Sequence, residues 1–295
     1  MPAAWIPITV FAAAAQTVRN AAQRHLTGAL GTLGATLVRF LYGVPFAAAW
    51  LAAALAFHPG ARLAPAHAAF AAWVLVGAVG QIGAMALLLK VMEERNFALG
   101  VAYSKSEVLQ VAVFGLLFLG DPITAGTGIA VVLGTAGVFL LSGGWRAGWS
   151  ARSAGLGVAC GGLFAISTVG YRGAELALAG SSFVVTAAFT LLVAQAVQTL
   201  ILCAWLLVRD RSVVMRALRA WRVSLVAGFM GAAASAGWFT AFAIEPVAHV
   251  RTLGLVELVF SYAVSRRLFR ERLSPVELAG IVLLGLGVAA ITVAR

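Results

Sequence analysis

Long apolar stretches separated by short polar breaks run from one end of the chain to the other. A membrane-spanning helix needs about 20 mostly apolar residues. The pattern predicts ten such helices, over residues 3–24, 29–57, 67–92, 97–119, 124–142, 153–177, 182–208, 223–244, 247–269 and 275–293. The sequence lacks the alternation of apolar and polar positions that is typical of transmembrane strands. We therefore expect an all-α integral membrane protein with ten transmembrane helices.

Helix-breaking residues support the boundaries between several of these helices. Gly and Pro interrupt helices, and charged residues favour the membrane surface. Such residues cluster at His58-Pro59-Gly60, Gly120-Asp121-Pro122, Gly143-Gly144-Trp145-Arg146, Glu245-Pro246 and Ser274-Pro275.

Composition agrees with a membrane location and excludes a soluble globular protein. Hydrophobic residues make up 62% of the chain and charged residues only 11%, whereas soluble proteins carry about a quarter charged residues. The 21 basic and 10 acidic residues give a net charge of +11, which in another context would suggest nucleic acid. In an apolar chain, clustered Arg instead sets topology, so we expect a lipid bilayer and no nucleic acid as partner. Cys160 and Cys203 lie in apolar runs and predict neither a disulfide framework nor a metal cluster.

Basic residues are concentrated in the loops after odd-numbered helices. They are Arg24, Arg95, Arg146, Arg152, Arg209, Arg211, Arg216, Arg219, Arg222, Arg266, Arg267, Arg270 and Arg272, whereas the other side has Arg62, Arg295 and little else. The positive-inside rule would place these loops in the cytoplasm and both termini outside. We expect a multi-pass protein of the inner (cytoplasmic) membrane.

The two halves of the chain resemble each other. An offset of 150 aligns Glu107 with Glu257, Asp121 with Glu271, Ala98 with Ala248, Gly137 with Gly287 and Val138 with Val288, and an offset of 153 aligns Arg19-Asn20-Ala21 with Arg172-Gly173-Ala174. The sequence thus predicts five-helix repeats over 1–142 and 153–295, joined by a linker at 143–152. Because five is odd, the second repeat would be inverted, an arrangement typical of secondary transporters.

The end of each half resembles the drug/metabolite transporter superfamily, in its EamA-type group of ten-helix permeases. The similar stretches are Phe118-Leu119-Gly120-Asp121-Pro122 with Gly137-Val138, and Phe269-Arg270-Glu271-Arg272-Leu273-Ser274 with Gly280 and Gly287-Val288. Arg39-Phe40-Leu41, Arg19 and Arg172 also resemble recurrent elements of that family. The resemblance implies a permease for small organic molecules with both termini in the cytoplasm, opposite to the orientation that the charge bias indicates. Many members carry proline where Glu107 and Glu257 stand, so their specificity does not transfer.

Two carboxylates within predicted helices are the first functional candidates. Ionisable residues at membrane depth are costly and usually face a cavity or a partner. Glu107 and Glu257 occupy equivalent positions of the two repeats, and Tyr103, Glu107 and Gln110 share one helical face. Buried carboxylates can exchange protons, so we predict proton coupling by Glu107 and Glu257. A buried ion pair that holds helices together is the alternative.

The cations and aromatic residues of the same region are candidate substrate contacts. Lys105 lies about 200° around its helix from Glu107 and could bind an anionic group, pair with another helix, or extend to the interface. For Arg251 the alternative to substrate binding is the same extension, because it lies close to Pro246. Arg39 suits a carboxylate or phosphate, or neutralises Glu107. Trp238 could stack on a planar substrate or simply pack, and Tyr103 and Gln110 complete the candidate binding set.

No catalytic, cofactor or metal site is expected, because no metal-ligand spacing and no phosphate-binding loop occurs in the sequence. The leading hypothesis is a secondary transporter, not an enzyme, that exports or exchanges amino-acid-like or drug-like molecules by alternating access, coupled to protons. Its expected partners are a small-molecule substrate, protons and lipid, and it would act as a monomer or homodimer. The alternatives are an uncoupled facilitator of the same fold, or a non-transport membrane protein such as a structural subunit or a membrane-embedded enzyme.

Overall fold

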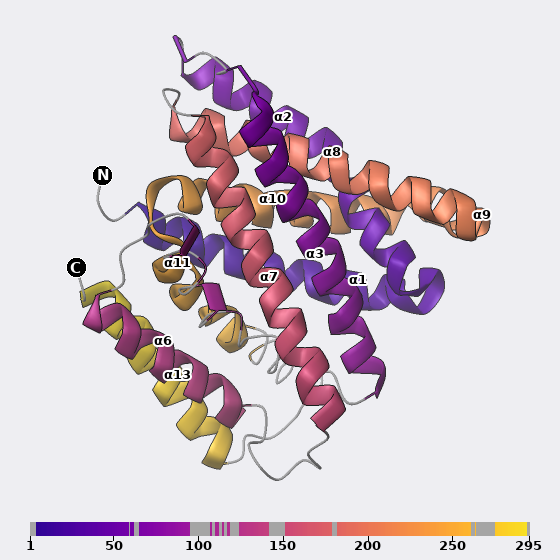
Figure 1. The fold of residues 1–295 in the computed structure, drawn as a ribbon. Coiled ribbons are helices and arrows are strands. Elements are labelled where there is room, and N and C mark those ends of the chain that lie inside the picture. The colour runs from indigo at the N-terminus through magenta and orange to yellow at the C-terminus, as the bar shows by residue number, and fades with distance from the viewer. Residues whose placement is uncertain are drawn as a thin grey trace. The chain divides into compact units, whose positions relative to one another are not determined.

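The computed structural model describes residues 4–58, 60–61, 65–94, 107, 110–111, 114, 117–118, 124–141, 151–178, 182–260, 263 and 275–293. Within these residues the fold is helical and contains no strand, so the prediction of an all-α protein is confirmed at that level. The helices are α1 (Trp5–Leu41), α2 (Val44–Phe57), α3 (Ala68–Glu94), α6 (Ala125–Leu141), α7 (Ala151–Ala177), α8 (Phe183–Arg209), α9 (Arg211–Arg219), α10 (Trp221–Ile244), α11 (Val247–Leu253) and α13 (Pro275–Val293) (Figure 1).

Among the described residues, four stretches are long and apolar enough to cross a membrane: Leu26–Phe57, Ala68–Leu88, Phe183–Arg209 and Trp221–Ile244. A lipid-exposed backbone must satisfy its own hydrogen bonds, which a helix does. Large apolar side chains remain exposed on these helices, for example Phe57, Leu75 and Leu200, each more than half exposed. Such a surface fits hydrocarbon and not water.

The N-terminal region has two breaks in its helical structure. The first lies within α1, where the backbone of Gly31 is not helical (φ 69°, ψ 170°), so a kink separates two helical stretches close to the break predicted between 3–24 and 29–57. Glycine adopts this conformation without the steric penalty of a Cβ. The second break was not predicted and falls inside the range 29–57, at Tyr42 and Gly43, where α2 begins with a proline in its first turn.

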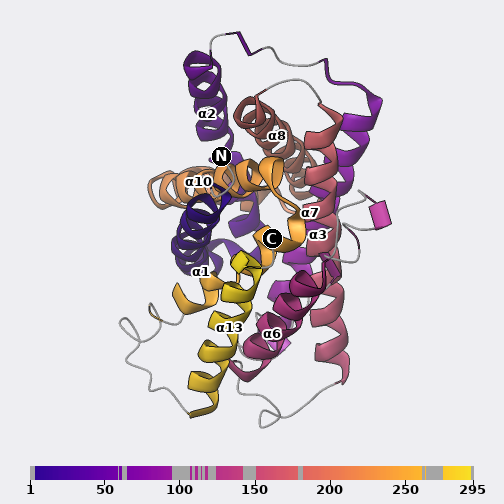
Figure 2. The ribbon, with the colours of Figure 1, turned by 90° about the vertical axis from the view of Figure 1, so that its left-hand side faces the viewer.

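The chain divides into two compact units, and each contains parts of both halves of the sequence. The first unit comprises Met1–Val79 and Gly170–Ile244, and the second comprises Gly80–Val169 and Glu245–Arg295. In the first unit α1 packs along α10, and α8 packs against α1, α2 and α10. Figure 2 shows α1, α2, α8 and α10 from another side.

Small residues allow close helix contacts in the second unit. α6 and α13 lie side by side (Figures 1 and 2), and a Cβ at Gly287 would lie only 2.8 Å from the backbone nitrogen of Gly134. α3 and α7 approach similarly at Gly80, where a Cβ would lie 3.1 Å from the carbonyl oxygen of Leu163. Membrane helices associate largely through such packing, because lipid tails are as apolar as the side chains.

Candidate functional site

The second unit buries an acid–base pair. Glu107 is 6% exposed, and its Oε1 lies 3.1 Å from Nε of Arg251, which extends from the last turn of α11. Charges removed from water are strongly destabilising unless they are paired and hydrogen-bonded. The two residues are 144 positions apart in the sequence (251 minus 107), so the pair joins segments from opposite halves of the chain.

Thr168 of α7 completes this cluster. Arg251 donates from a terminal guanidinium nitrogen to Oγ1 of Thr168 at 2.5 Å. The same hydroxyl lies 3.4 Å from Oε1 of Glu107 and 2.9 Å from the carbonyl oxygen of Phe164. A hydroxyl has one proton to donate, so it can hydrogen-bond the carboxylate or the helix backbone. The arrangement gives the threonine two alternative acceptors beside a buried ion pair.

An interruption of the predicted helix over 247–269 positions Arg251. α11 ends at Leu253, Gly254 and Leu255 form a turn, and residues 256–260 are helical again. Hydrogen bonds to the third preceding residue replace the α-helical pattern here, from the Leu255 amide to Thr252 and from the Glu257 amide to Gly254. Short stretches of this tighter geometry inside a helix often mark functional hinges.

Glu257 lies on the first turn after this interruption and is 5% exposed. The structure thus places both predicted proton-coupling carboxylates in the second unit, and both are buried. α6 also packs against this interruption. A Cβ at Gly134 of α6 would lie only 2.8 Å from Cδ1 of Leu255.

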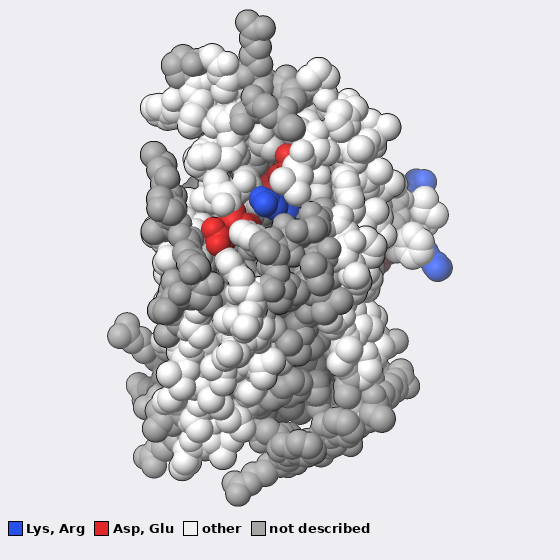
Figure 3. Space-filling view, turned by 60° about the vertical axis from the view of Figure 1, so that its left-hand side comes forward, with Lys and Arg blue, Asp and Glu red and all other residues white. Residues whose placement is uncertain are grey.

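The remaining candidates fall in different places. Gln110 donates to the carbonyl oxygen of Val158 in α7 at 3.2 Å, and a Cβ on Gly162 would lie only 2.7 Å from its Oε1. Tyr103 and Lys105 lie outside the described residues. Arg251, for which extension to the interface was the alternative, lies largely buried against Glu107. The space-filling view shows acidic and basic side chains gathered in one small area, with further basic side chains at the right-hand edge of the view (Figure 3).

Arg39 and Trp238 belong to the first unit. Arg39 is 4% exposed, and its stem passes, together with that of Arg19, over Gly231 of α10, where a Cβ would lie 3.1 and 3.5 Å from them. Trp238 donates its indole N–H to Oε1 of Gln16 in α1 at 2.9 Å. Both residues therefore contribute to the contact between α1 and α10.

One buried acid was missed by the sequence analysis. Glu175 of α7 is 5% exposed, and neither of its carboxylate oxygens has a hydrogen-bond partner among the described residues. Arg172 lies three residues earlier, on the same face of the helix, and its positive charge attracts the Glu175 carboxylate. The guanidinium of Arg172 also donates to the carbonyl oxygen of Phe242. The spacing of Arg172 and Glu175 in the sequence could have indicated that the two charges interact. No sequence pattern indicated a role for Thr168.

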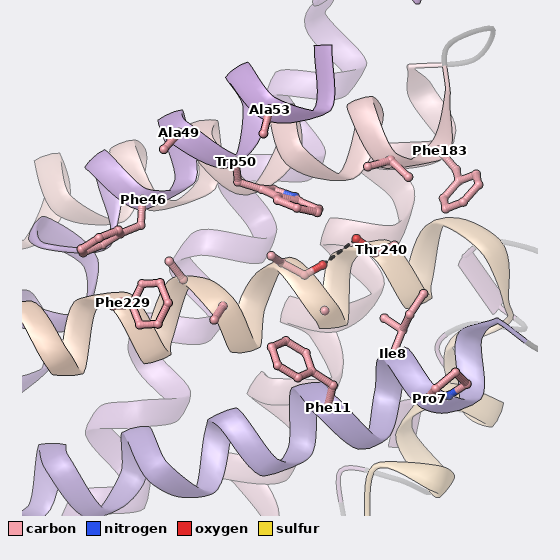
Figure 4. Close-up of a pocket in the computed structure, with 15 residues that line it drawn as sticks. Pro7, Ile8, Phe11, Phe46, Ala49, Trp50, Ala53, Phe183, Phe229 and Thr240 are labelled. Atoms are coloured by element: carbon pink, nitrogen blue, oxygen red, sulfur yellow. Dashed lines mark hydrogen bonds between the residues drawn. The ribbon is translucent and has the colours of Figure 1, made fainter. Parts of the chain in front are cut away.

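The first unit also contains an apolar pocket of about 730 Å³, between α1, α2, α8 and α10 (Figure 4). Five aromatic side chains line it: Phe11, Phe46, Trp50, Phe183 and Phe229. The hydroxyl of Thr240 faces its own helix and donates to the carbonyl oxygen of Ala236 at 2.7 Å. The wall therefore presents mainly hydrocarbon and aromatic surface, which suits an apolar ligand group.

Within the described part of the chain, no group of three or more His, Cys, Asp or Glu side chains has the geometry to hold a metal ion. His249 and Glu245 form an i,i+4 contact of 2.5 Å at the start of α11, which is a pair and not a metal-ligand set.

Comparison with known proteins supports the fold alone. No family model matches the chain, and no curated protein matches its sequence. Among 26 matching chains of solved structures is one described as "Crystal structure of protein", with a TM-score of 0.75 and 18% sequence identity. The match covers 100% of this chain and 98% of the other. The chain is thus similar over its whole length to a known fold.

Proposed function

We propose that the protein is a secondary transporter of the cytoplasmic membrane that exports or exchanges small organic molecules by alternating access. The observation that carries this proposal is the buried Glu107–Arg251 pair at an interrupted helix. Secondary transporters typically place charged residues and discontinuous helices together near the centre of the membrane, where substrate and coupling ion bind.

Proton coupling is the second part of the proposal. Protonation of Glu107 would weaken its ion pair with Arg251, because it removes the negative charge that attracts the guanidinium. The released guanidinium would then be available to an anionic group of the substrate, and Thr168 has a backbone acceptor for its own proton in that state. Glu257, on the far side of the interruption, is the second proposed proton site.

The proposal also includes ten spans in two inverted repeats and membership of the drug/metabolite transporter superfamily. The sequence offsets and the motifs at the end of each half support it. The pairing of α6 with α13 through Gly134 and Gly287 gives further support, since these helices occupy equivalent positions in the two predicted repeats.

The substrate we propose has a charged group and an apolar body, such as a hydrophobic amino acid or a drug-like molecule. The Arg251–Glu107 pair of the second unit supports the charged group. Considered by itself, the aromatic lining of the first unit's pocket suits an apolar ligand group.

The test is uptake of a panel of amino acids and dyes into proteoliposomes, with and without a pH gradient. We expect a gradient-driven flux that is lost when Glu107→Gln and Glu257→Gln are combined. The matched control is Glu245→Gln, which removes a carboxylate that pairs with His249 and should leave the flux unchanged. If the flux through the unmodified protein does not depend on the pH gradient, the protein is an uncoupled facilitator. If no compound is transported, a non-transport protein is favoured.

A further inference from the structure

A short amphipathic helix with a dense basic flank connects α8 to α10. α9 has nine residues, Arg211–Arg219, and follows the exposed Asp210. The stretch 209–222 contains five arginines and one acidic residue: Arg209, Arg211, Arg216, Arg219 and Arg222, with Asp210. All five arginines are exposed.

The side chains of α9 fall into three sectors around its axis. At about 100° per residue, taking Arg211 as zero, the buried Val214 and Ala217 lie at about 300° and 240°. The exposed apolar residues Met215 and Leu218 lie at about 40° and 340° on the same scale.

The polar sector follows immediately. Arg219 and Arg216 lie at about 80° and 140°. The helix therefore has one face for the protein, one exposed sector with Met215 and Leu218, and one exposed basic sector, in that order. Arg211, at zero, lies within the second sector at the start of the helix, where its Nε donates to the carbonyl oxygen of Leu207 at 3.1 Å.

The buried face holds α9 firmly in place. Val213 lies against Gly34 of α1, where a Cβ would be 2.9 Å from its Cγ1. The Tyr42 hydroxyl lies 3.4 and 3.2 Å from the carbonyl oxygens of Ala217 and Leu218. These contacts fix which faces of α9 point away from the protein.

Aromatic side chains extend the exposed surface at both ends of α9. The guanidinium of Arg209 lies 5.2 Å from the ring centre of Trp205, and that of Arg222 lies 5.4 Å from the ring centre of Trp221. Both indoles are about half exposed, at 52% and 50%. Tryptophan is enriched where hydrocarbon meets lipid headgroups, so both rings suit the membrane interface.

We propose that α9 and its flanking arginines form a docking surface for anionic phospholipids of the surrounding bilayer. Met215 and Leu218 contact the upper acyl chains, and Arg216 and Arg219 bind the headgroup phosphates. Amphipathic helices with basic faces bind membranes by this combination of apolar burial and charge attraction. A free phosphate ion would explain the basic sector but not the exposed apolar sector beside it.

The test is binding of short-chain phosphatidylglycerol and phosphatidylcholine to the full-length protein in neutral detergent, measured by titration calorimetry. We expect tighter binding of phosphatidylglycerol. The double variant Arg216→Gln and Arg219→Gln should weaken its binding by about fivefold per arginine removed, with phosphatidylcholine unaffected.

Two further variants separate charge from apolar contact. Arg216→Lys with Arg219→Lys keeps the charge and should keep the preference for phosphatidylglycerol. Met215→Gln with Leu218→Gln should weaken both lipids to a similar degree. All six side-chain changes are at exposed positions, so the variants should fold.

Equal binding of both lipids by the unmodified protein would overturn the proposal, and so would an unchanged preference in the Arg→Gln variant. Displacement of the lipid by excess inorganic phosphate would show an ion site instead of a lipid surface. Each of these results is independent of whether the protein transports anything.

Discussion

Arg251 pairs with Glu107 through Nε and Oε1 at 3.1 Å, two residues before α11 ends at Leu253. The end of α11 thus positions the Arg251 side chain. The contact of Arg251 with Glu107 in turn ties this helix end to the other half of the sequence. The pair is therefore both a candidate site and a structural link within the second unit.

Removing one partner of this pair should destabilise the protein strongly. We expect Arg251→Gln or Glu107→Gln to lower the free energy of unfolding by about 3–5 kcal/mol, because either change leaves a buried charge uncompensated. The double variant should be clearly more stable than the sum of the single effects predicts. The measurement is a double-mutant cycle by denaturant titration in detergent. Strictly additive effects would show that the two charges do not interact.

Gly287 should tolerate no side chain. A Cβ there would lie 2.8 Å from the Gly134 nitrogen and 3.0 Å from the Ala130 carbonyl oxygen, and backbone atoms cannot move aside as side chains do. We expect Gly287→Ala to destabilise the protein by about 1–3 kcal/mol. Gly285→Ala, on the same helix with open space around it, should be neutral or stabilising by up to about 1 kcal/mol. Thermal unfolding of the two variants compares them directly, and equal effects would contradict the close approach of α6 and α13.

Glu175 and Arg172 should respond oppositely to neutralisation. Glu175→Gln removes a buried charge whose oxygens have no described hydrogen-bond partner, so we expect stability to be unchanged or raised by about 1 kcal/mol. Arg172→Gln removes the cation beside that charge and should lower stability at neutral pH by about 2 kcal/mol or more. The second effect should shrink in acid, because protonation of Glu175 removes the uncompensated charge. Unfolding curves at several pH values test this, and a penalty for Arg172→Gln that does not change with pH would contradict it.

Asp210 caps α9 and should make its first turn sensitive to acid. Ser212 donates to Oδ1 of Asp210 from its hydroxyl at 2.6 Å and from its amide at 3.0 Å, and these bonds hold the pKa of Asp210 below its ordinary value. A lowered pKa stabilises the fold above the ordinary range of aspartate, and this contribution is lost as pH falls through the lowered value.

Hydrogen exchange at the Ser212 and Val213 amides measures this effect. Asp210→Ala should speed exchange at neutral pH, whereas Asp210→Asn should keep the cap, because asparagine caps helices equally well, and should remove the pH dependence. Exchange in Asp210→Ala that matches the unmodified protein would show that the cap contributes nothing.

Sequence patterns located most boundaries of the described helices because local chemistry decides them. Proline and charge ended α10 before Glu245-Pro246 and started α13 at Pro275. The interruption at Gly254 was not predicted, because single glycines are common inside membrane helices and this one differs only through its tertiary contacts, such as that of Leu255 with Gly134.

The candidate site was predicted residue by residue but not as a set of contacts. Membrane depth marked Glu107, Glu257 and Arg251 as candidates, and the repeat offset added weight to the two carboxylates. Arg39 was one suggested partner for Glu107, and Arg251 was not considered as one, although the structure pairs Glu107 with Arg251. Pairing between residues so distant in sequence depends on helix packing, which periodicity does not encode. Thr168 was missed for the same reason.

The kink in α1 has a practical consequence for mapping which side of the membrane each segment faces. The backbone leaves the helical conformation at Gly31, and the residues on both sides of it are helical, so no loop of several residues separates the two stretches. A reporter inserted at 25–28, where the sequence suggests a connection, would interrupt the first helical stretch shortly before the kink. Loss of the reporter signal there would then reflect a damaged protein and say nothing about sidedness.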